Sequence, residues 1–269
     1  MQSTTSDEIR DAVRAYYSAI ATGGSPGCCS PKGQTGCCVT EEDLVHSQTS
    51  SEKLGYTAKQ LTEAPVESNL GLGCGNPQAI AELKTGETVL DLGSGAGFDS
   101  FLAARQVEPT GRVIGVDMTP TMISKARENA AKGNFANVEF RLGEIEHMPL
   151  ADNTVDAIIS NCVINLSPSK QQVFHEAWRV LKSGGRLAIS DIVASAELPE
   201  EVRRDLALYT GCMAGASLIG DLEAMLQAAG FVDIRIQPKD ASRVFIRDWA
   251  PGRSIEDYVV SASIEAVKP

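Results

Sequence analysis

The sequence predicts an α/β fold built on a mostly parallel sheet, and two observations support this. Over residues 66–195, short apolar strand patterns alternate with helical patterns, as in the crossover units of a parallel sheet. A glycine-rich turn, Gly93 to Gly97, joins the first of these strands to the first helix. Ligands of open parallel sheets bind at the carboxyl ends of the strands, where such turns lie. We expect residues 1–65 to form a helical, Cys-rich extension and residues 196–269 an α+β region that completes the sheet.

The central region supplies the strands and helices of the predicted sheet. Apolar strand patterns cover residues 88–92, 112–117, 138–142, 155–159 and 186–193. Helical spacing of apolar residues covers 98–106, 119–131 and 170–181. Thr119 and Pro120 suit the start of the second of these helices, and Ser183-Gly184-Gly185 suits the end of the third.

The flanking regions contain further elements. Residues 7–20 and 41–45 read as helices before the central region, and residues 57–63 form another short segment. After it, helical patterns cover 199–208 and 221–229, and strand patterns cover 231–236 and 259–267. No element is predicted over residues 238–257.

Composition and charge exclude several classes of protein. The chain has 269 residues, 43% of them hydrophobic and 22% charged, which is ordinary for a folded globular protein. The net charge of −11 and the lack of a Lys/Arg cluster argue against nucleic-acid binding, which depends on neutralising phosphates. No apolar run reaches the roughly 18 residues that a membrane span needs, and the N-terminal segment lacks the features of a secretory signal. We therefore expect a cytoplasmic protein with no membrane partner.

The seven cysteines are unusual for a chain of this kind. Their number is odd and no export signal accompanies them, so a disulfide framework is disfavoured. We expect free thiols, which indicate soft-ion binding, redox chemistry or simple burial.

Acidic residues near the glycine-rich turn indicate what it binds. The glycine spacing is Gly-x-Gly-x-Gly, whereas a pyrophosphate favours Gly-x-Gly-x-x-Gly. Asp91 lies two residues before Gly93, and Asp117 ends the next strand. A carboxylate at Asp91 suits a cationic sulfonium ligand and disfavours a pyrophosphate, and one at Asp117 can accept hydrogen bonds from ribose hydroxyls.

Together these features resemble the class I S-adenosylmethionine-dependent methyltransferases. The resemblance covers about residues 85–195 and rests on segments 89–97, 115–118, 143–150, 152–156 and 181–186. It implies a Rossmann-like domain over residues 66–195 with a seven-stranded sheet, and S-adenosylmethionine as co-substrate. The cofactor-binding residues that it implies are Asp91, Gly93, Ser94, Gly95, Gly97, Asp117, Met118, Glu144, Ile145 and Asn161.

Three cysteines indicate the methyl acceptor, which the fold alone does not name. Cys74 precedes the first strand, Cys162 follows the fourth, and Cys212 lies in the C-terminal region. Three converging thiolates would suit a soft trivalent ion with a lone pair, such as arsenic(III). A single buried cysteine at a strand end is, by contrast, commonly a small apolar residue.

The surroundings of all three cysteines resemble the arsenite S-adenosylmethionine methyltransferases. The matching segments are 73–77, 160–167 and 211–216. This resemblance implies that Cys162 and Cys212 hold arsenic(III), that Cys74 is a third thiol or a redox partner, and that arsenite and methylated arsenicals are substrates. It further implies a thiol reductant such as thioredoxin or glutathione, arsenic detoxification, an arsenic site in the C-terminal region and no structural metal.

Two vicinal pairs, Cys28-Cys29 and Cys37-Cys38, have three interpretations. They could capture or relay arsenic(III), bind zinc through four thiolates, or form a loop of exposed thiols. Adjacent cysteines fit the usual Cys-x₂₋₄-Cys spacing of zinc sites badly, so capture is favoured over zinc.

Two alternative functions are open at this point. A methyltransferase of a small organic acceptor, such as a quinone precursor, would share the fold and would keep most activity without Cys162. A non-catalytic arsenic-binding sensor would keep S-adenosylmethionine only as a structural ligand, and the acidic charge balance argues against the nucleic-acid face that it would need.

Overall fold

The computed structural model describes residues 5–23 and 41–269, with the side chains of residues 41–44 left aside. The vicinal pairs Cys28-Cys29 and Cys37-Cys38 lie outside the described residues, so their three interpretations stay predictions. Among the described residues, no helix combines the length and the apolar character needed to cross a membrane.

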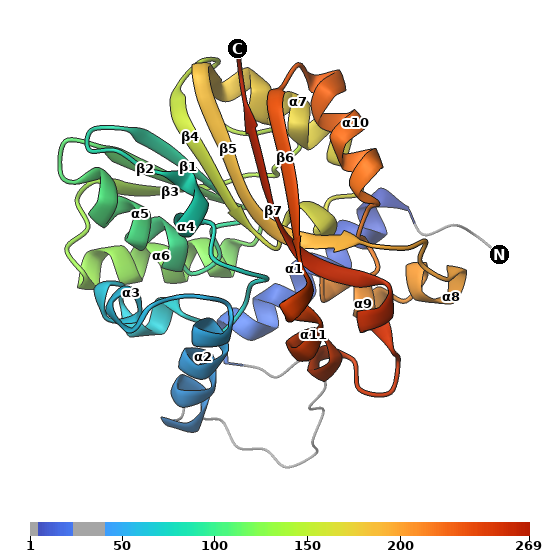
Figure 1. Ribbon diagram of the computed structural model, residues 1–269. Coiled ribbons are helices and arrows are strands. Elements are labelled where there is room, and N and C mark those ends of the chain that lie inside the picture. The colour runs from blue at the N-terminus through green and yellow to red at the C-terminus, as the bar shows by residue number, and fades with distance from the viewer. Residues whose placement is uncertain (1–4, 24–40) are drawn as a thin grey trace.

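A seven-stranded sheet in the order β3-β2-β1-β4-β5-β7-β6 forms the centre of the molecule (Figure 1). The strands are β1 (Thr88–Leu92), β2 (Arg112–Asp117), β3 (Val138–Leu142), β4 (Val155–Asn161), β5 (Leu181–Ala194), β6 (Val232–Lys239) and β7 (Val259–Val267). All pairs from β3 to β5 are parallel, whereas β7 runs antiparallel to both β5 and β6. The mostly parallel, seven-stranded sheet confirms the predicted fold class.

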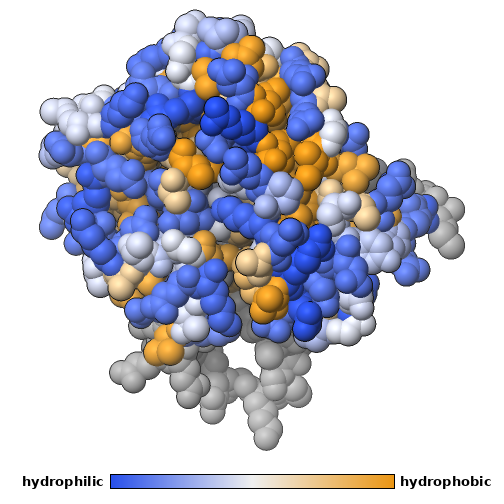
Figure 2. All heavy atoms as spheres, in the orientation of Figure 1, coloured by the Kyte–Doolittle hydropathy of each residue, from blue (hydrophilic) through white to orange (hydrophobic). Residues whose placement is uncertain are grey.

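Helices cover both faces of the sheet (Figure 1). On one face lie α4 (Gln78–Ala81), α5 (Phe98–Val107) and α6 (Pro120–Lys132), and on the other α7 (Lys170–Val180) and α10 (Ile219–Ala229). Each face has its own apolar core, the first containing Phe101 and Phe140 and the second Phe174 and Leu226. Burial of these side chains supplies most of the driving force for folding. Hydrophilic side chains dominate the outer face seen in Figure 2.

A third cluster of helices lies at the carboxyl ends of the parallel strands (Figure 1). It contains α1 (Ser6–Ala21), α8 (Glu200–Arg203), α9 (Leu206–Thr210) and α11 (Arg243–Trp249). Their core includes Val13, Cys74, Cys212 and Ile246. Two further helices, α2 (Glu41–Lys53) and α3 (Ala58–Glu63), follow the undescribed segment.

Three predicted boundaries differ from the structure. The helix expected over 199–208 is divided into α8 and α9, because the Asp205 side chain accepts hydrogen bonds from the N–H groups of Ala207 and Leu208 and so starts a new helix. Strand β5 begins at Leu181 rather than at residue 186, so the glycines that end α7 lie within it. Helix α11 (Arg243–Trp249) and the 3₁₀ turns Asp240–Ser242 and Ile255–Asp257 lie within the segment 238–257, for which the sequence predicted no element.

Candidate functional site

A cavity of about 840 Å³ lies at the carboxyl ends of the parallel strands. Its wall combines the glycine turn after β1, the ends of β2 and β4, helix α1 and the start of the C-terminal region. The predicted residues that line it are Asp91, Gly93, Ser94, Gly95, Asp117, Met118, Ile145, Asn161, Cys162 and Cys212. Gly97, Glu144 and Cys74 do not line it.

The glycine turn brings the backbone directly to this cavity. Gly93 and Gly95 have φ of +65° and +51°, a left-handed conformation that favours glycine. Open space surrounds Gly95, whereas a Cβ at Gly97 would lie 2.7 Å from the rings of Phe101 and Phe140. Gly97 therefore serves close packing behind the turn, and its placement differs from the predicted role in lining the cofactor site.

Three carboxylates surround the turn, of which Asp91 and Asp99 are buried and Asp117 is partly buried. The Asp91 carboxylate accepts a hydrogen bond of 2.6 Å from the Ser100 hydroxyl, and Asp117 accepts one from the Gly95 N–H at 3.0 Å. Burial raises the pKa of Asp99 and Asp117, and it raises that of Asp91 well above the ordinary range, with repulsion from Asp99 adding to the effect. Ionised carboxylates in such a place gain from a cationic ligand, so the site suits a sulfonium or ammonium group.

Asn161 connects this acidic wall to Cys74. Its amide Nδ2 donates to the Tyr56 hydroxyl at 2.9 Å and to Asp99 Oδ2 at 3.1 Å. The Tyr56 hydroxyl itself donates to Asp99 Oδ1 at 2.8 Å. The Oδ1 of Asn161 accepts the backbone N–H of Cys74 at 2.9 Å. Sequence reasoning missed Tyr56 and Asp99, although Asp99 follows the glycine turn by two residues.

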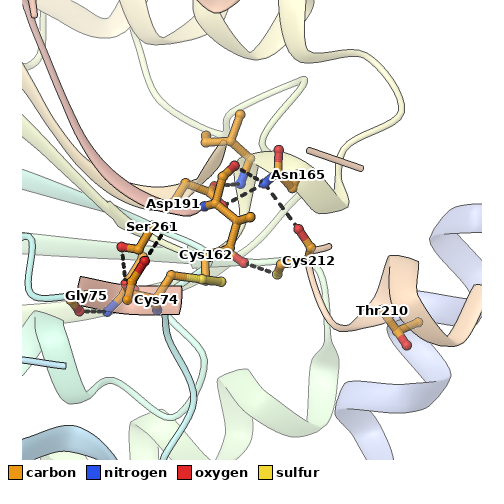
Figure 3. The surroundings of a disulfide bond; sticks show 12 residues. Cys74, Gly75, Cys162, Asn165, Asp191, Thr210, Cys212 and Ser261 are labelled. Atoms are coloured by element: carbon orange, nitrogen blue, oxygen red, sulfur yellow. Dashed lines mark hydrogen bonds between the residues drawn. A yellow bond between two sulfur atoms is a disulfide. The ribbon is translucent and has the colours of Figure 1, made fainter. Parts of the chain in front are cut away.

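Cys74 and Cys162 are joined as a disulfide, with their Cα atoms 5.4 Å apart (Figure 3). The sequence predicted free thiols, and this expectation is wrong for the pair as the structure shows it. The hydrogen bond from Cys74 N–H to Asn161 holds the turn before β1 against the end of β4, which sets a Cα separation typical of disulfides. Cys74 is buried at 1% exposure and Cys162 is half-buried.

Cys212 lies beside this pair as a buried free thiol (Figure 3). Its Sγ donates a hydrogen bond to the carbonyl oxygen of Cys162 at 2.7 Å. Burial raises the pKa of the Cys212 thiol well above its ordinary value, and the negative charge of Asp191 raises it further. The φ angles of Cys162 and Cys212 are +59° and +64°, in the left-handed region that is uncommon for residues other than glycine.

Asp191 lies close to the disulfide (Figure 3). One of its carboxylate oxygens and the Sγ atoms of Cys74 and Cys162 all lie within 4.8 Å of one another, and Cys212 is not a member of this group. Burial raises the pKa of Asp191 to about 6, against the opposing effect of backbone N–H groups and Lys170. Asp191 carries no local sequence signal, because only strand pairing brings this position of β5 beside Cys162.

Helix α1 forms a roof over the cavity. Val13, Tyr16 and Tyr17 line it, and the Tyr17 hydroxyl donates to the carbonyl oxygen of Thr210 at 3.2 Å. Arg10 lies 3.5 Å from a carboxylate oxygen of Glu144 and 3.3 Å from one of Glu146. The sequence predicted that Glu144 lies at the edge of the cofactor site. Instead, Glu144 forms an ion pair with Arg10 of helix α1 and does not line the cavity.

Comparison with known proteins gives consistent matches. The model of a methyltransferase domain matches residues 83–230. An arsenite methyltransferase of Halobacterium salinarum is 54% identical over 268 residues, covering 98% of this chain and 67% of that protein. An arsenite methyltransferase of Mus musculus is 35% identical over 248 residues, covering 88% of this chain and 62% of that protein.

A solved structure also matches the fold. The crystal structure of an arsenic(III) S-adenosylmethionine methyltransferase from Chlamydomonas reinhardtii superimposes with a TM-score of 0.62 at 31% identity, covering 83% of this chain and 73% of that one. The chain spans 49% to 67% of the length of the curated arsenite methyltransferases that it matches.

Proposed function

The chain belongs to the family of arsenite methyltransferases, and from this we propose that it transfers methyl groups from S-adenosylmethionine to arsenic(III) bound by Cys74, Cys162 and Cys212. The biological effect would be arsenic detoxification. The observation that carries this proposal is that one cavity is lined both by the Gly93–Gly95 turn and by Cys162 and Cys212. A methyl donor bound at the glycine turn and an arsenic(III) acceptor bound by the cysteines would therefore lie in the same cavity.

The residues of the cavity wall fit the proposed cofactor. S-adenosylmethionine supplies an electrophilic methyl group on a sulfonium sulfur when it is bound. The buried carboxylates of Asp91 and Asp99, whose pKa values are raised chiefly by burial, favour its positive charges when they are ionised. Asp117 is at the carboxyl end of β2, where one oxygen receives the Gly95 N–H and the carboxylate can accept ribose hydroxyls. Met118 and Ile145 would pack on the adenine, with Ser94 beside them.

The cysteines of this chain bind and orient the acceptor. Loading forms arsenic–sulfur bonds, and each thiol proton leaves as water with a hydroxyl of arsenite. The arsenic lone pair then attacks the methyl carbon as the carbon–sulfur bond breaks, with its electron pair remaining on a neutral thioether. No general base is needed, so positioning supplies the main catalytic effect.

A thiol reductant completes the proposed cycle. Methyl transfer oxidises arsenic formally by two electrons, and two thiolates can return these electrons by forming a disulfide. The Cys74–Cys162 bond is the form of the pair that such a step would leave. Two external thiols, from thioredoxin or glutathione, would then reduce it, which requires the reducing conditions of the cytoplasm.

Incubation of the protein with arsenite, S-adenosylmethionine and glutathione tests the proposal directly. We expect methylated arsenic and S-adenosylhomocysteine in matched amounts. Formation of S-adenosylhomocysteine only when an organic acceptor replaces arsenite would indicate a methyltransferase of another substrate. Arsenite binding without any methyl transfer would indicate a sensor.

A further inference from the structure

A short segment after β4 lies at the centre of the three cysteines. It runs from Asn161 through Cys162 to Asn165, with the 3₁₀ turn Ile164–Leu166 at its end. The two asparagines flank Cys162, and their side chains contact two different parts of the chain. One part carries Cys74 and the other carries Cys212.

Asn161 holds the loop of Cys74. Its Oδ1 accepts the Cys74 N–H at 2.9 Å, and its Nδ2 donates to the Gly75 carbonyl oxygen at 2.9 Å. The two hydrogen bonds thus clamp the backbone on both sides of the Cys74 side chain. Gly73 has φ of +133°, and a Cβ there would lie 2.9 Å from Asn161 Nδ2. The approach of this loop therefore depends on a glycine at residue 73.

Asn165 holds the loop of Cys212 (Figure 3). Its Nδ2 lies within hydrogen-bond distance of the Ile192 carbonyl oxygen at 2.6 Å, of Asp191 Oδ1 at 3.0 Å and of the Cys212 carbonyl oxygen at 3.2 Å, so the amide joins the Cys212 loop to β5. The backbone of Asn165 also packs against Gly215, where a Cβ would overlap the Asn165 carbonyl oxygen. Asn165 is 2% exposed, so loss of its amide would leave buried polar partners unpaired, which is costly.

We propose that Asn161 and Asn165 are positioning residues, each of which holds one distant cysteine loop against Cys162. Asn161 positions Cys74, and Asn165 positions Cys212. The segment from Asn161 to Asn165 then holds the loops of Cys74 and Cys212 in place next to Cys162. The catalytic interpretation of this frame rests on the proposed function, whereas the positioning itself does not.

Two features favour this role over general core packing. First, both asparagines direct their amides to the backbone of the cysteine loops, where the hydrogen bonds fix position without touching the sulfur atoms. Second, Cys162 and Cys212 keep left-handed backbone conformations, which persist only where the surrounding contacts hold them.

Amide hydrogen exchange of the full chain tests the proposal. The variants Asn161→Leu and Asn165→Leu keep the shape of the side chain and remove its hydrogen bonds. Asn137→Leu is the matched control, because the Asn137 amide also donates to two backbone carbonyls, those of Ala104 and Glu108, far from the cysteines. We expect Asn165→Leu to speed exchange at residues 211–216 by about five- to tenfold, as loss of a net hydrogen bond implies, and to leave residues 71–76 unchanged. We expect Asn161→Leu to speed exchange at residues 71–76 and to leave residues 211–216 unchanged.

Disulfide formation supplies a second readout that needs no arsenic. Asn161→Leu should slow oxidation of the reduced Cys74–Cys162 pair severalfold, whereas Asn165→Leu and Asn137→Leu should not. In methylation assays, Asn165→Leu should raise KM for arsenite and leave the affinity for S-adenosylmethionine unchanged.

The outcomes separate the two proposals. Equal effects of both variants on both loops, or no effect of either, would overturn the positioning roles. A crossed pattern of exchange in a protein that does not methylate arsenic would keep the positioning roles and overturn the proposed function. If a leucine variant does not fold, Asn161→Ser and Asn165→Ser repeat the measurement with a smaller side chain.

Discussion

The Cys212 thiol donates a hydrogen bond of 2.7 Å to the backbone carbonyl of Cys162, a residue 50 positions away in the sequence. This contact joins the C-terminal region to the end of β4, and both residues line the cavity that the glycine turn also lines. The proposed acceptor site and the proposed donor site are therefore adjacent before any ligand binds.

Replacing Cys162 by serine should abolish arsenite methylation, because a hydroxyl is a hard, poorly ionised ligand for a soft ion. The affinity for S-adenosylmethionine, measured by calorimetry, should change by less than about twofold, since a thiol-to-hydroxyl exchange removes little surface. Retention of most methylation activity in this variant would contradict arsenic binding at Cys162.

Replacing Asp117 by alanine should weaken S-adenosylmethionine binding about 10- to 100-fold, the effect expected for losing hydrogen bonds to a charged group. Arsenite-induced changes in Trp and Tyr fluorescence should persist, because Asp117 is not a member of the group formed by Cys74, Cys162 and Asp191. Asp240→Ala, at a side chain that is 86% exposed, is the matched control. A parallel loss of both kinds of binding would mean that the two sites are not separable.

Two alanine substitutions in the glycine turn should have opposite consequences. Gly97→Ala should destabilise the fold by about 2–4 kcal/mol, from overpacking against Phe101 and Phe140 together with left-handed strain. Gly95→Ala should cost about 1–2 kcal/mol of strain alone, because open space surrounds it. In the cofactor titration, however, Gly95→Ala should weaken binding and Gly97→Ala should not. Thermal unfolding and calorimetry measure the two effects, and the reverse assignment would place Gly97 in the cofactor site.

Cofactor affinity should rise with pH through the acidic range. Burial raises the pKa values of Asp91, Asp99 and Asp117, so part of this cluster is protonated above the ordinary carboxylate range. A cation binds the ionised forms more tightly and releases protons, and binding therefore strengthens as pH increases. S-adenosylhomocysteine lacks the sulfonium charge and should show a weaker dependence. Calorimetry of both compounds at several pH values checks this, and equal slopes would argue against a charge effect at the sulfonium.

The buried carboxyl of Asp191, which lies beside the disulfide and outside this cluster, should affect the stability of the ligand-free protein with the opposite sign. A carboxyl whose folded pKa lies above its unfolded pKa binds more protons in the folded state. The free energy of unfolding therefore decreases as pH rises through the interval between the two values. For Asp191 this interval extends from the ordinary carboxylate range to about 6. Chemical unfolding at several pH values measures this slope, and a stability that increases with pH over the interval would contradict it.

Local patterns were enough to predict most of the fold. The strands β1, β2 and β4 carry mostly apolar runs, β3 alternates apolar and charged residues, and β7 begins and ends where its pattern does. The glycine turn and Asp117 were recognisable because their spacing is local to one strand–helix–strand unit. The division of α8 from α9 was missed, since it depends on one capping side chain, Asp205.

The parts of the site that the sequence did not reveal depend on contacts between distant segments. Asp191 lies beside Cys162 only because β5 pairs with β4. Arg10 on α1 reaches Glu144 only because the N-terminal helix packs against α6 and α9 near the carboxyl ends of the strands. Glu144 and Gly97 lie in the segments where the sequence placed the cofactor site, but neither lines the cavity. Glu144 forms an ion pair with Arg10, and Gly97 packs against Phe101 and Phe140. The roles assigned to the cysteines stay predictions.

The bond between Cys74 and Cys162 joins residues 88 positions apart in the sequence, and the segment between them includes strands β1 to β4 with the glycine turn. A cross-link around a loop of this length restricts the unfolded chain by about 4–5 kcal/mol in the entropic treatment. An enzyme of the proposed kind would therefore be more stable toward unfolding in the oxidised form, with the disulfide closed, than in the reduced form. Without a reductant, methyl transfer would stop while the folded protein persisted, and activity would return once the disulfide was reduced.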